Sequence, residues 1–75
     1  MSTNHIDKYK QIGVQIAYYR NQRGITQQEL ADKIGISKSY LSKIESPNTA
    51  KSFSLDVLFD LAHELNVSII DLLKL

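Results

Sequence analysis

The apolar residues of this chain recur at spacings of three and four along most of its length, and this period constrains the fold more than any other feature. An α-helix has 3.6 residues per turn, so such spacing predicts amphipathic helices. The first apolar stripe comprises Tyr9, Ile12, Ile16 and Tyr19, and a later one comprises Leu55, Leu58, Ala62 and Leu65, which Phe59 and Leu61 widen. No segment alternates in the manner of a strand, so the chain is expected to be all-α.

Signals for helix ends divide the chain into five predicted helices, and the first two are set by glycines and a threonine. The first helix ends near Gly24, a natural stop. Thr26 and Glu29 then form a capping box, which starts the second helix at Gln27. Gly35 stands where a left-handed residue ends this second helix.

Serine residues begin the other three predicted helices. Ser37 is the expected cap of a third helix that runs to about Glu45, and Ser54 caps a fourth. Ser68, with Asp71 three residues later, opens a short fifth helix. Five short amphipathic helices in one chain predict a compact helical bundle.

A chain of 75 residues has room for one hydrophobic core, so residues 1–75 are expected to form a single domain, ordered over about residues 8–74. The chain has no cysteine, which excludes disulfide frameworks and thiolate zinc sites. Its longest apolar run is four residues, Ile16–Tyr19, far below the roughly 20 that a membrane helix needs. We therefore expect a cytoplasmic protein without a membrane partner.

The net charge of +1 hides an uneven distribution along the chain. Residues 1–51 hold eight basic and four acidic groups, for a balance of +4, whereas residues 52–75 hold one basic and four acidic groups, for a balance of −3. This asymmetry favours a basic working end and an acidic end turned away from a polyanion. Charge alone leaves open that both ends are merely solvated surfaces.

Residues 27–45 predict two helices joined by a short turn that contains glycine, which is the physical description of a helix-turn-helix. Ala31 is small enough for the next helix to cross closely, and Gly35 supplies the backbone angle of the turn. The residues expected to point inward from both helices are Leu30, Ile34, Ile36, Leu41 and Ile44. Gly13 lies inside the first predicted helix, and the sequence predicts that the helix tolerates this glycine at some cost in stability.

The segment QQELADKIGISKSYLSKIE resembles the Cro/cI-type (XRE) helix-turn-helix family of bacterial and phage regulators, and the resemblance covers about residues 9–73. It implies a compact five-helix bundle of the lambda-repressor-like type, with the helix-turn-helix in the second and third helices. It also implies a sequence-specific transcriptional regulator, a repressor, that binds double-stranded DNA. Such a protein would bind a pseudo-palindromic operator as a homodimer, with residues 38–45 in the major groove.

The outward face of the third predicted helix carries short hydroxyls and lysines, which suit the major groove. By this pattern and by the resemblance, the residues expected to contact bases are Lys38, Ser39, Ser42 and Lys43. One alternative is an ordinary polar surface helix. Another is that Lys43 serves only as a phosphate anchor.

A second set of residues is expected to contact DNA phosphates, largely by the resemblance: Gln27, Gln28, Tyr40, Lys51 and Ser52. Gln27 begins the second helix, whose amides and positive dipole end would help it, and the alternative is that it is only a favourable first-turn residue. For Tyr40, half-buried packing is an alternative. The loop SPNTAKSFS departs from the glycine-containing basic loop common in the family, which weakens the case for Lys51 and Ser52.

Arg20 and Glu45 occupy marginal positions on the first and third helical stripes. In relatives of this family, an arginine and a glutamate so placed form a buried ion pair, so the resemblance implies a structural pair here. The alternative is two unrelated surface charges.

The last predicted helix is unusually apolar for one helix end, with Leu72, Leu73 and Leu75 in the last four residues. This favours self-association through the C-terminal helix region. The alternative is that these leucines close the core of a single chain.

Nothing in the sequence indicates catalysis, a cofactor or a metal site. Asp60, His63 and Glu64 are better explained as a solvated helix face than as metal ligands. The main rival to DNA binding is a protein-interaction or antitoxin-like module that uses the same bundle and a separate protein partner. Val14 and Tyr18, which share the outer face of the first helix, support that rival.

Overall fold

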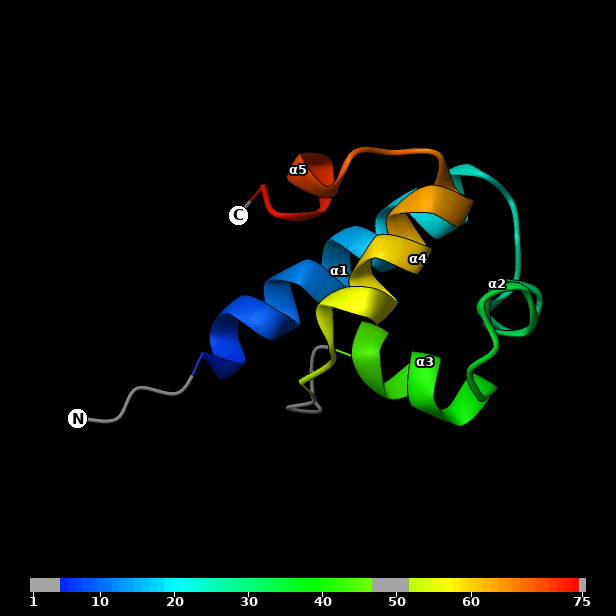
Figure 1. Cartoon of the computed structure of the whole chain (residues 1–75), viewed down its shortest axis with the longest axis horizontal. Helices are drawn as coiled ribbons and strands as arrows, with labels where there is room; N and C mark the ends of the chain where they lie inside the picture. Colours follow the sequence, from blue (N-terminus) through cyan, green and yellow to red (C-terminus); the bar gives the residue numbers. More distant parts are fainter. Residues whose placement is uncertain (1–4, 47–51, 75) are drawn as a thin grey trace.

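The structure, a computed structural model, describes residues 5–46 and 52–74. In these residues the chain forms five helices: α1 (Ile6–Gln22), α2 (Gln27–Ile34), α3 (Lys38–Glu45), α4 (Leu55–Leu65) and α5 (Ile69–Leu72). The all-α class and the five predicted helices are confirmed. Helices α1 and α4 pack at the centre, with α3 on one side, α5 on the other and α2 across one end (Figure 1).

Side-chain caps fix the starts of α2 and α5 in the way the sequence predicts. Thr26 Oγ1 accepts from the Glu29 N–H at 3.0 Å, and Glu29 Oε1 accepts from the Thr26 N–H at 2.8 Å. Ser68 and Asp71 form the same reciprocal pair at 3.1 and 3.0 Å. The backbone N–H of the capping residue is the main cause that lowers the pKa of each carboxyl below its ordinary value. Both carboxylates are therefore favoured in their charged forms.

All five helices contribute to one apolar core. Its buried side chains are Ile12, Ile16, Leu30, Ala31, Leu41, Ile44, Leu58, Leu61, Ala62, Leu65 and Leu72. Ile34 and Ile36, which the sequence also placed inside, are partly buried against this core. The core therefore joins α2 and α3 to α1 and α4 and makes the turn between them part of a single packed unit.

Two residues assigned to the apolar stripe of α4 are exposed instead. Leu55 is 66% exposed and Phe59 is 53% exposed, so the prediction that both face the core is wrong. They lie one turn apart on the edge of the stripe, whereas its centre, at Leu58 and Leu61, is covered by the neighbouring helices. The apolar face of α4 is therefore wider than the surface available to cover it.

Leu72 also departs from its predicted role in self-association. It is fully buried, because α5 packs against both α1 and α4 and turns this side chain into the core of its own chain. Leu73 remains 45% exposed, and Leu75 lies outside the described residues. Of the three leucines, only Leu73 is both described and available to a second molecule.

Gly13 is required by the packing of two helices and is not merely tolerated within α1. It is buried where α1 crosses α3, and a Cβ atom at this position would overlap the carbonyl oxygen of Ile44. The absence of a side chain thus permits the close approach of the two helices. The earlier interpretation of Gly13 is wrong in this respect.

Candidate nucleic-acid interface

The turn between α2 and α3 is short and held by hydrogen bonds. Gly35 takes the predicted left-handed conformation, with φ of 77°. The Ile36 N–H donates to the Ala31 carbonyl at 3.0 Å, and the Ser37 hydroxyl caps α3 by accepting from the Tyr40 N–H at 3.0 Å. These bonds and the shared core fix α3 relative to α2, as in a helix-turn-helix.

Helix α3 has one buried and one exposed face. Leu41 and Ile44 are 0% and 2% exposed and anchor the inner face. The outer side carries the four predicted base-contact residues, all of them exposed: Lys38, Ser39, Ser42 and Lys43. Hydroxyl and ammonium groups with this exposure can reach hydrogen-bonding groups on base edges.

The predicted phosphate-contact residues occupy more varied environments. Gln28 is exposed, and its Nε2 donates to Asp32 Oδ1 one turn along α2 at 2.8 Å. Tyr40 is partly buried and packs against the core, which favours the packing alternative for its ring. Ser52 is exposed before α4, and Lys51 lies outside the described residues.

Arg20 and Glu45 form the ion pair that the resemblance implied. Arg20 Nε lies 2.8 Å from Glu45 Oε2, and Arg20 Nη2 donates to Glu45 Oε1 at 2.9 Å. Arg20 Nη1 also donates to the Ile25 carbonyl at 2.9 Å, which ties in the connection between α1 and α2. The two side chains are only 12% and 4% exposed, so each charge depends on the other for its stability.

Gln27 joins this pair, which the sequence pattern does not reveal. Its Nε2 donates to Glu45 Oε1 at 3.0 Å. The two residues are 18 positions apart in the sequence, and the packing of α2 against α3 brings them together. Within residues 5–46 and 52–74, no buried side-chain nitrogen or oxygen lacks a hydrogen-bond partner. The Arg20–Glu45–Gln27 network is therefore fully satisfied.

An open hollow of about 670 Å³ lies beside this network. It is lined by Arg20, Asn21, Gly24, Ile25, Thr26, Gln27, Gln28 and Lys38. These residues include two cations and three carboxamides, and none of the described lining residues is acidic. The hollow connects the first turn of α2 to the first residue of α3, so it offers a track of hydrogen-bond donors for an anion.

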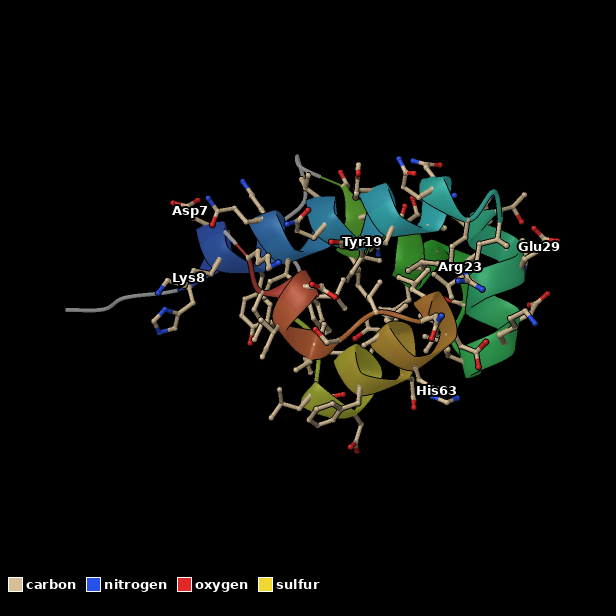
Figure 2. The ribbon with its side chains drawn as sticks, turned by 90° about the horizontal axis from the view of Figure 1, so that it is seen from above. Asp7, Lys8, Tyr19, Arg23, Glu29 and His63 are labelled. Atoms are coloured by element: carbon tan, nitrogen blue, oxygen red, sulfur yellow. The ribbon has the colours of Figure 1, made fainter. Side chains whose placement is uncertain are left out.

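The acidic groups lie mainly in other parts of the bundle. Helices α4 and α5 carry Asp56, Asp60, Glu64 and Asp71. Helix α5 lies on the far side of α1 and α4 from α3 (Figure 1). Beside the hollow, Glu45 is held by Arg20, and Glu29 points outward at the α2 end of the molecule (Figure 2). The geometry thus places Asp71 of α5 on the far side of the bundle from the basic outer face of α3 (Figure 1).

Two other kinds of site are not found in the part of the chain that the structure describes. No helix there is long and apolar enough to cross a membrane. No three His, Asp or Glu side chains there gather closely enough to hold a metal ion. His63 points outward from α4 at the edge of the bundle (Figure 2).

Comparison with known proteins matches a helix-turn-helix family model to residues 16–72. The transcriptional regulator SinR of Bacillus subtilis (strain 168) is 42% identical over 62 residues, which cover 83% of this chain and 55% of SinR. The chain thus spans about half the length of this curated relative.

Two solved structures share the arrangement of helices. The clp gene regulator ClgR of Corynebacterium glutamicum superimposes with a TM-score of 0.81 at 31% identity, covering 87% of this chain and 67% of that one. The restriction-modification controller protein C.AhdI of Aeromonas hydrophila gives a TM-score of 0.83 at 24% identity, covering 93% and 99%. The second likeness shows the fold, a compact five-helix bundle of the lambda-repressor-like type.

The family model spans both helices of the turn, the core that holds them and the exposed face of α3. The relatives found over this region are transcriptional regulators, as the sequence predicted, and not enzymes. The chain therefore belongs to the Cro/cI-type (XRE) helix-turn-helix family of DNA-binding transcriptional regulators.

Proposed function

We propose that this chain represses transcription by binding a specific operator in double-stranded DNA with α3 in the major groove. The observation that carries the proposal is the exposed face of α3, where lysines and small hydroxyls project from a helix anchored on its other side by Leu41 and Ile44. Small side chains let a helix lie deep in a groove about 12 Å wide. As a regulator of transcription, the protein would act in the cytoplasm of a bacterial cell.

In this proposal, base reading and phosphate binding fall to different residues. Lys38, Ser39, Ser42 and Lys43 contact base edges. Gln27 and Gln28 contact the phosphate backbone, supported by their place on the acid-free hollow beside the amides of the first turn of α2. Ser52 and Lys51 would add phosphate contacts near the start of α4, and Tyr40 serves mainly in packing.

The proposed active form is a homodimer on a pseudo-palindromic operator. Leu73, Ile70, Leu55 and Phe59 form the α4–α5 apolar patch, and they are 45%, 66%, 66% and 53% exposed. Leu73 and Leu55 line one common hollow, so these two members of the patch are neighbours. A two-fold dimer through this patch would place two copies of α3 on successive major grooves, with half-site centres about 10 bp apart or a multiple of that spacing.

Selection of bound sequences from a random duplex library tests the proposal most directly. The expected product is a pseudo-palindrome whose affinity falls steeply with salt, with a log–log slope of about −4 to −7 for the dimer. Sedimentation equilibrium of wild type and Leu73→Ser tests the dimer, because Leu73 is exposed and its loss leaves the core intact. No enrichment of any sequence would contradict DNA recognition, and a wild type that stays monomeric on DNA would contradict the dimer.

The second candidate function is a protein-interaction or antitoxin-like module. Val14 and Tyr18 favour it, since they are 50% and 53% exposed on the outer side of α1. A docking surface of this kind gains its affinity from buried apolar anchors. Substituting both residues by serine would abolish partner binding under this alternative, whereas it would leave operator affinity unchanged under the primary proposal.

A further inference from the structure

The carboxylate of Glu45 serves two donors from two different helices. Its Oε2 accepts from Arg20 of α1 at 2.8 Å, and its Oε1 accepts both from Arg20 at 2.9 Å and from Gln27 of α2 at 3.0 Å. Glu45 is 6% exposed, so this acceptor is almost removed from water. A buried carboxylate requires its donors, and both of them are held in place by it.

This contact restrains Gln27 before any DNA binds. A glutamine side chain loses much rotational freedom when a ligand orders it. One N–H of the Gln27 carboxamide is already bonded to Glu45, which restrains the amide and leaves the second N–H for another acceptor. Gln27 lines the open hollow together with Lys38. A phosphate oxygen bound in this hollow would therefore lie close to the Gln27 side chain.

Arg20 makes the arrangement compatible with a phosphate. An unpaired carboxylate next to the hollow would repel an anion. The guanidinium of Arg20 binds Glu45 through two parallel hydrogen bonds and balances its charge. Glu45 can therefore hold Gln27 without placing a net negative charge beside the expected phosphate.

From these contacts we infer that Glu45 is a positioning residue for DNA binding: it holds the Gln27 carboxamide so that its second N–H donates to a backbone phosphate. The inference rests on the proposed phosphate role of Gln27. It assigns the buried Arg20–Glu45 pair a contribution to DNA affinity, through Gln27, in addition to its contribution to stability. A held donor loses less freedom on binding than a mobile one, and this is the source of the gain.

The test is a mutant cycle on operator affinity. Replacing both charges together, as Arg20→Met with Glu45→Met, removes the acceptor of Gln27 without stranding a buried charge, and such paired replacements are often neutral for stability. Gln27→Ala should weaken operator binding about tenfold, the size of a hydrogen bond to a charged group. The paired replacement should weaken binding about threefold to tenfold in wild type and less than about twofold when Gln27→Ala is already present.

Gln28→Ala is the matched control, because Gln28 is the neighbouring glutamine but bonds to Asp32 instead of Glu45. The effect of the paired replacement should persist in full in this background. An effect of equal size with and without Gln27 would overturn the inference and leave the pair a purely structural role.

A second measurement needs no variant. In NMR relaxation of the wild type, the side-chain NH₂ of Gln27 should be rigid, whereas that of Gln22, exposed at the end of α1, should be mobile. Equal mobility of the two carboxamides would overturn the inference even if the paired variant failed to fold.

Results that reject the inference can be distinguished from results that reject the proposed function. A Gln27→Ala protein with full operator affinity rejects the inference and the phosphate role of Gln27 but leaves operator binding through α3 standing, and a wild type that binds no DNA rejects both.

Discussion

The α3 side of the bundle and its α4–α5 side expose opposite kinds of side chain around one shared core. The α3 side exposes lysine and serine, and the bulky groups Leu41 and Ile44 are turned fully inward. The α4–α5 side leaves large apolar groups such as Leu55 and Ile70 in solvent, each 66% exposed. The polar surface suits a hydrated, charged ligand such as DNA, whereas the apolar patch suits a second protein surface.

The two sides also differ in how they are held together. Next to α3, buried charge and a close helix crossing fix the geometry through Arg20, Glu45 and Gly13. The α5 helix has four residues and depends on a capping box and on Leu72 for its place. Substitutions near α3 should therefore have larger effects on folding than those in the exposed apolar patch.

The largest effect is expected from breaking the buried ion pair on one side only. Arg20→Met leaves Glu45 buried without its charged partner, which should lower the free energy of unfolding by about 3–5 kcal/mol. Arg23→Met, at the exposed end of the same helix, should change it by less than about 0.5 kcal/mol. Urea melts of both variants measure the contrast. Equal small shifts would mean that the pair does not hold the α3 side together.

A methyl group at the helix crossing should have the next largest effect. The Cβ of Gly13→Ala would overlap the Ile44 carbonyl oxygen and force α1 away from α3, at a cost of about 1–3 kcal/mol. The helix propensity of alanine offsets up to about 1 kcal/mol of this. Thermal unfolding should show a net loss for Gly13→Ala and almost none for the exposed neighbour Val14→Ala. A stabilised Gly13→Ala protein would show that the crossing has room to adjust.

Lys43 tests the polar side without affecting the core. Lys43→Ala should cost about 1–3 kcal/mol on the best operator and relax the preference at one or two base positions. Gln27→Ala should instead weaken all sequences about equally, because a phosphate contact reads no base. Binding of each variant to a library of single-base operator changes separates the two behaviours. If Lys43→Ala keeps the full preference profile, base reading passes to Lys38, Ser39 and Ser42.

The smallest predicted effect is the loss of stability in acid from the two capping boxes. The pKa of Glu29 is lowered from 4.5 and that of Asp71 from 3.8 in the folded chain, chiefly by the backbone N–H groups that they accept from. A lowered folded pKa means that the unfolded chain takes up the proton more readily, so this stability is present above pH 4.5 and is lost as the pH falls below it. Glu29→Gln with Asp71→Asn should unfold with a weaker dependence on acid, as followed by urea melts from pH 6 to 3. An identical acid dependence in wild type and variant would contradict this.

The sequence predicts those features that depend on neighbours along the chain. Thr26 with Glu29 and Ser68 with Asp71 are local pairs, so their capping boxes and the helix starts are found three residues apart in the sequence. Gly35 is predictable for the same reason, because one residue adopts the left-handed turn. The resemblance of residues 27–45 to the family then supplies the three-dimensional arrangement.

The features that the sequence does not predict depend on which helices meet. Leu55 and Phe59 belong to the helical stripe of α4, but among the residues that the structure describes no other helix covers that edge. The overlap at Gly13 requires the path of α3, and the bond between Gln27 and Glu45 requires the packing of α2 against α3. A helical wheel contains neither of these long-range relations.

The separation of charge within the molecule bears on how it meets DNA, in addition to how it is held there. A net charge of +1 gives little attraction at a distance, but residues 1–51 carry +4 and residues 52–75 carry −3, so the molecule has an electric dipole. Within about 10 Å of a phosphate chain, the range of unscreened interaction in ordinary salt, that dipole turns the basic segment toward the duplex and the acidic one away. Encounters would therefore begin in the orientation that places α3 over the groove. If the chain binds DNA as proposed, this charge pattern would raise the fraction of productive collisions while keeping the overall attraction to unrelated DNA low.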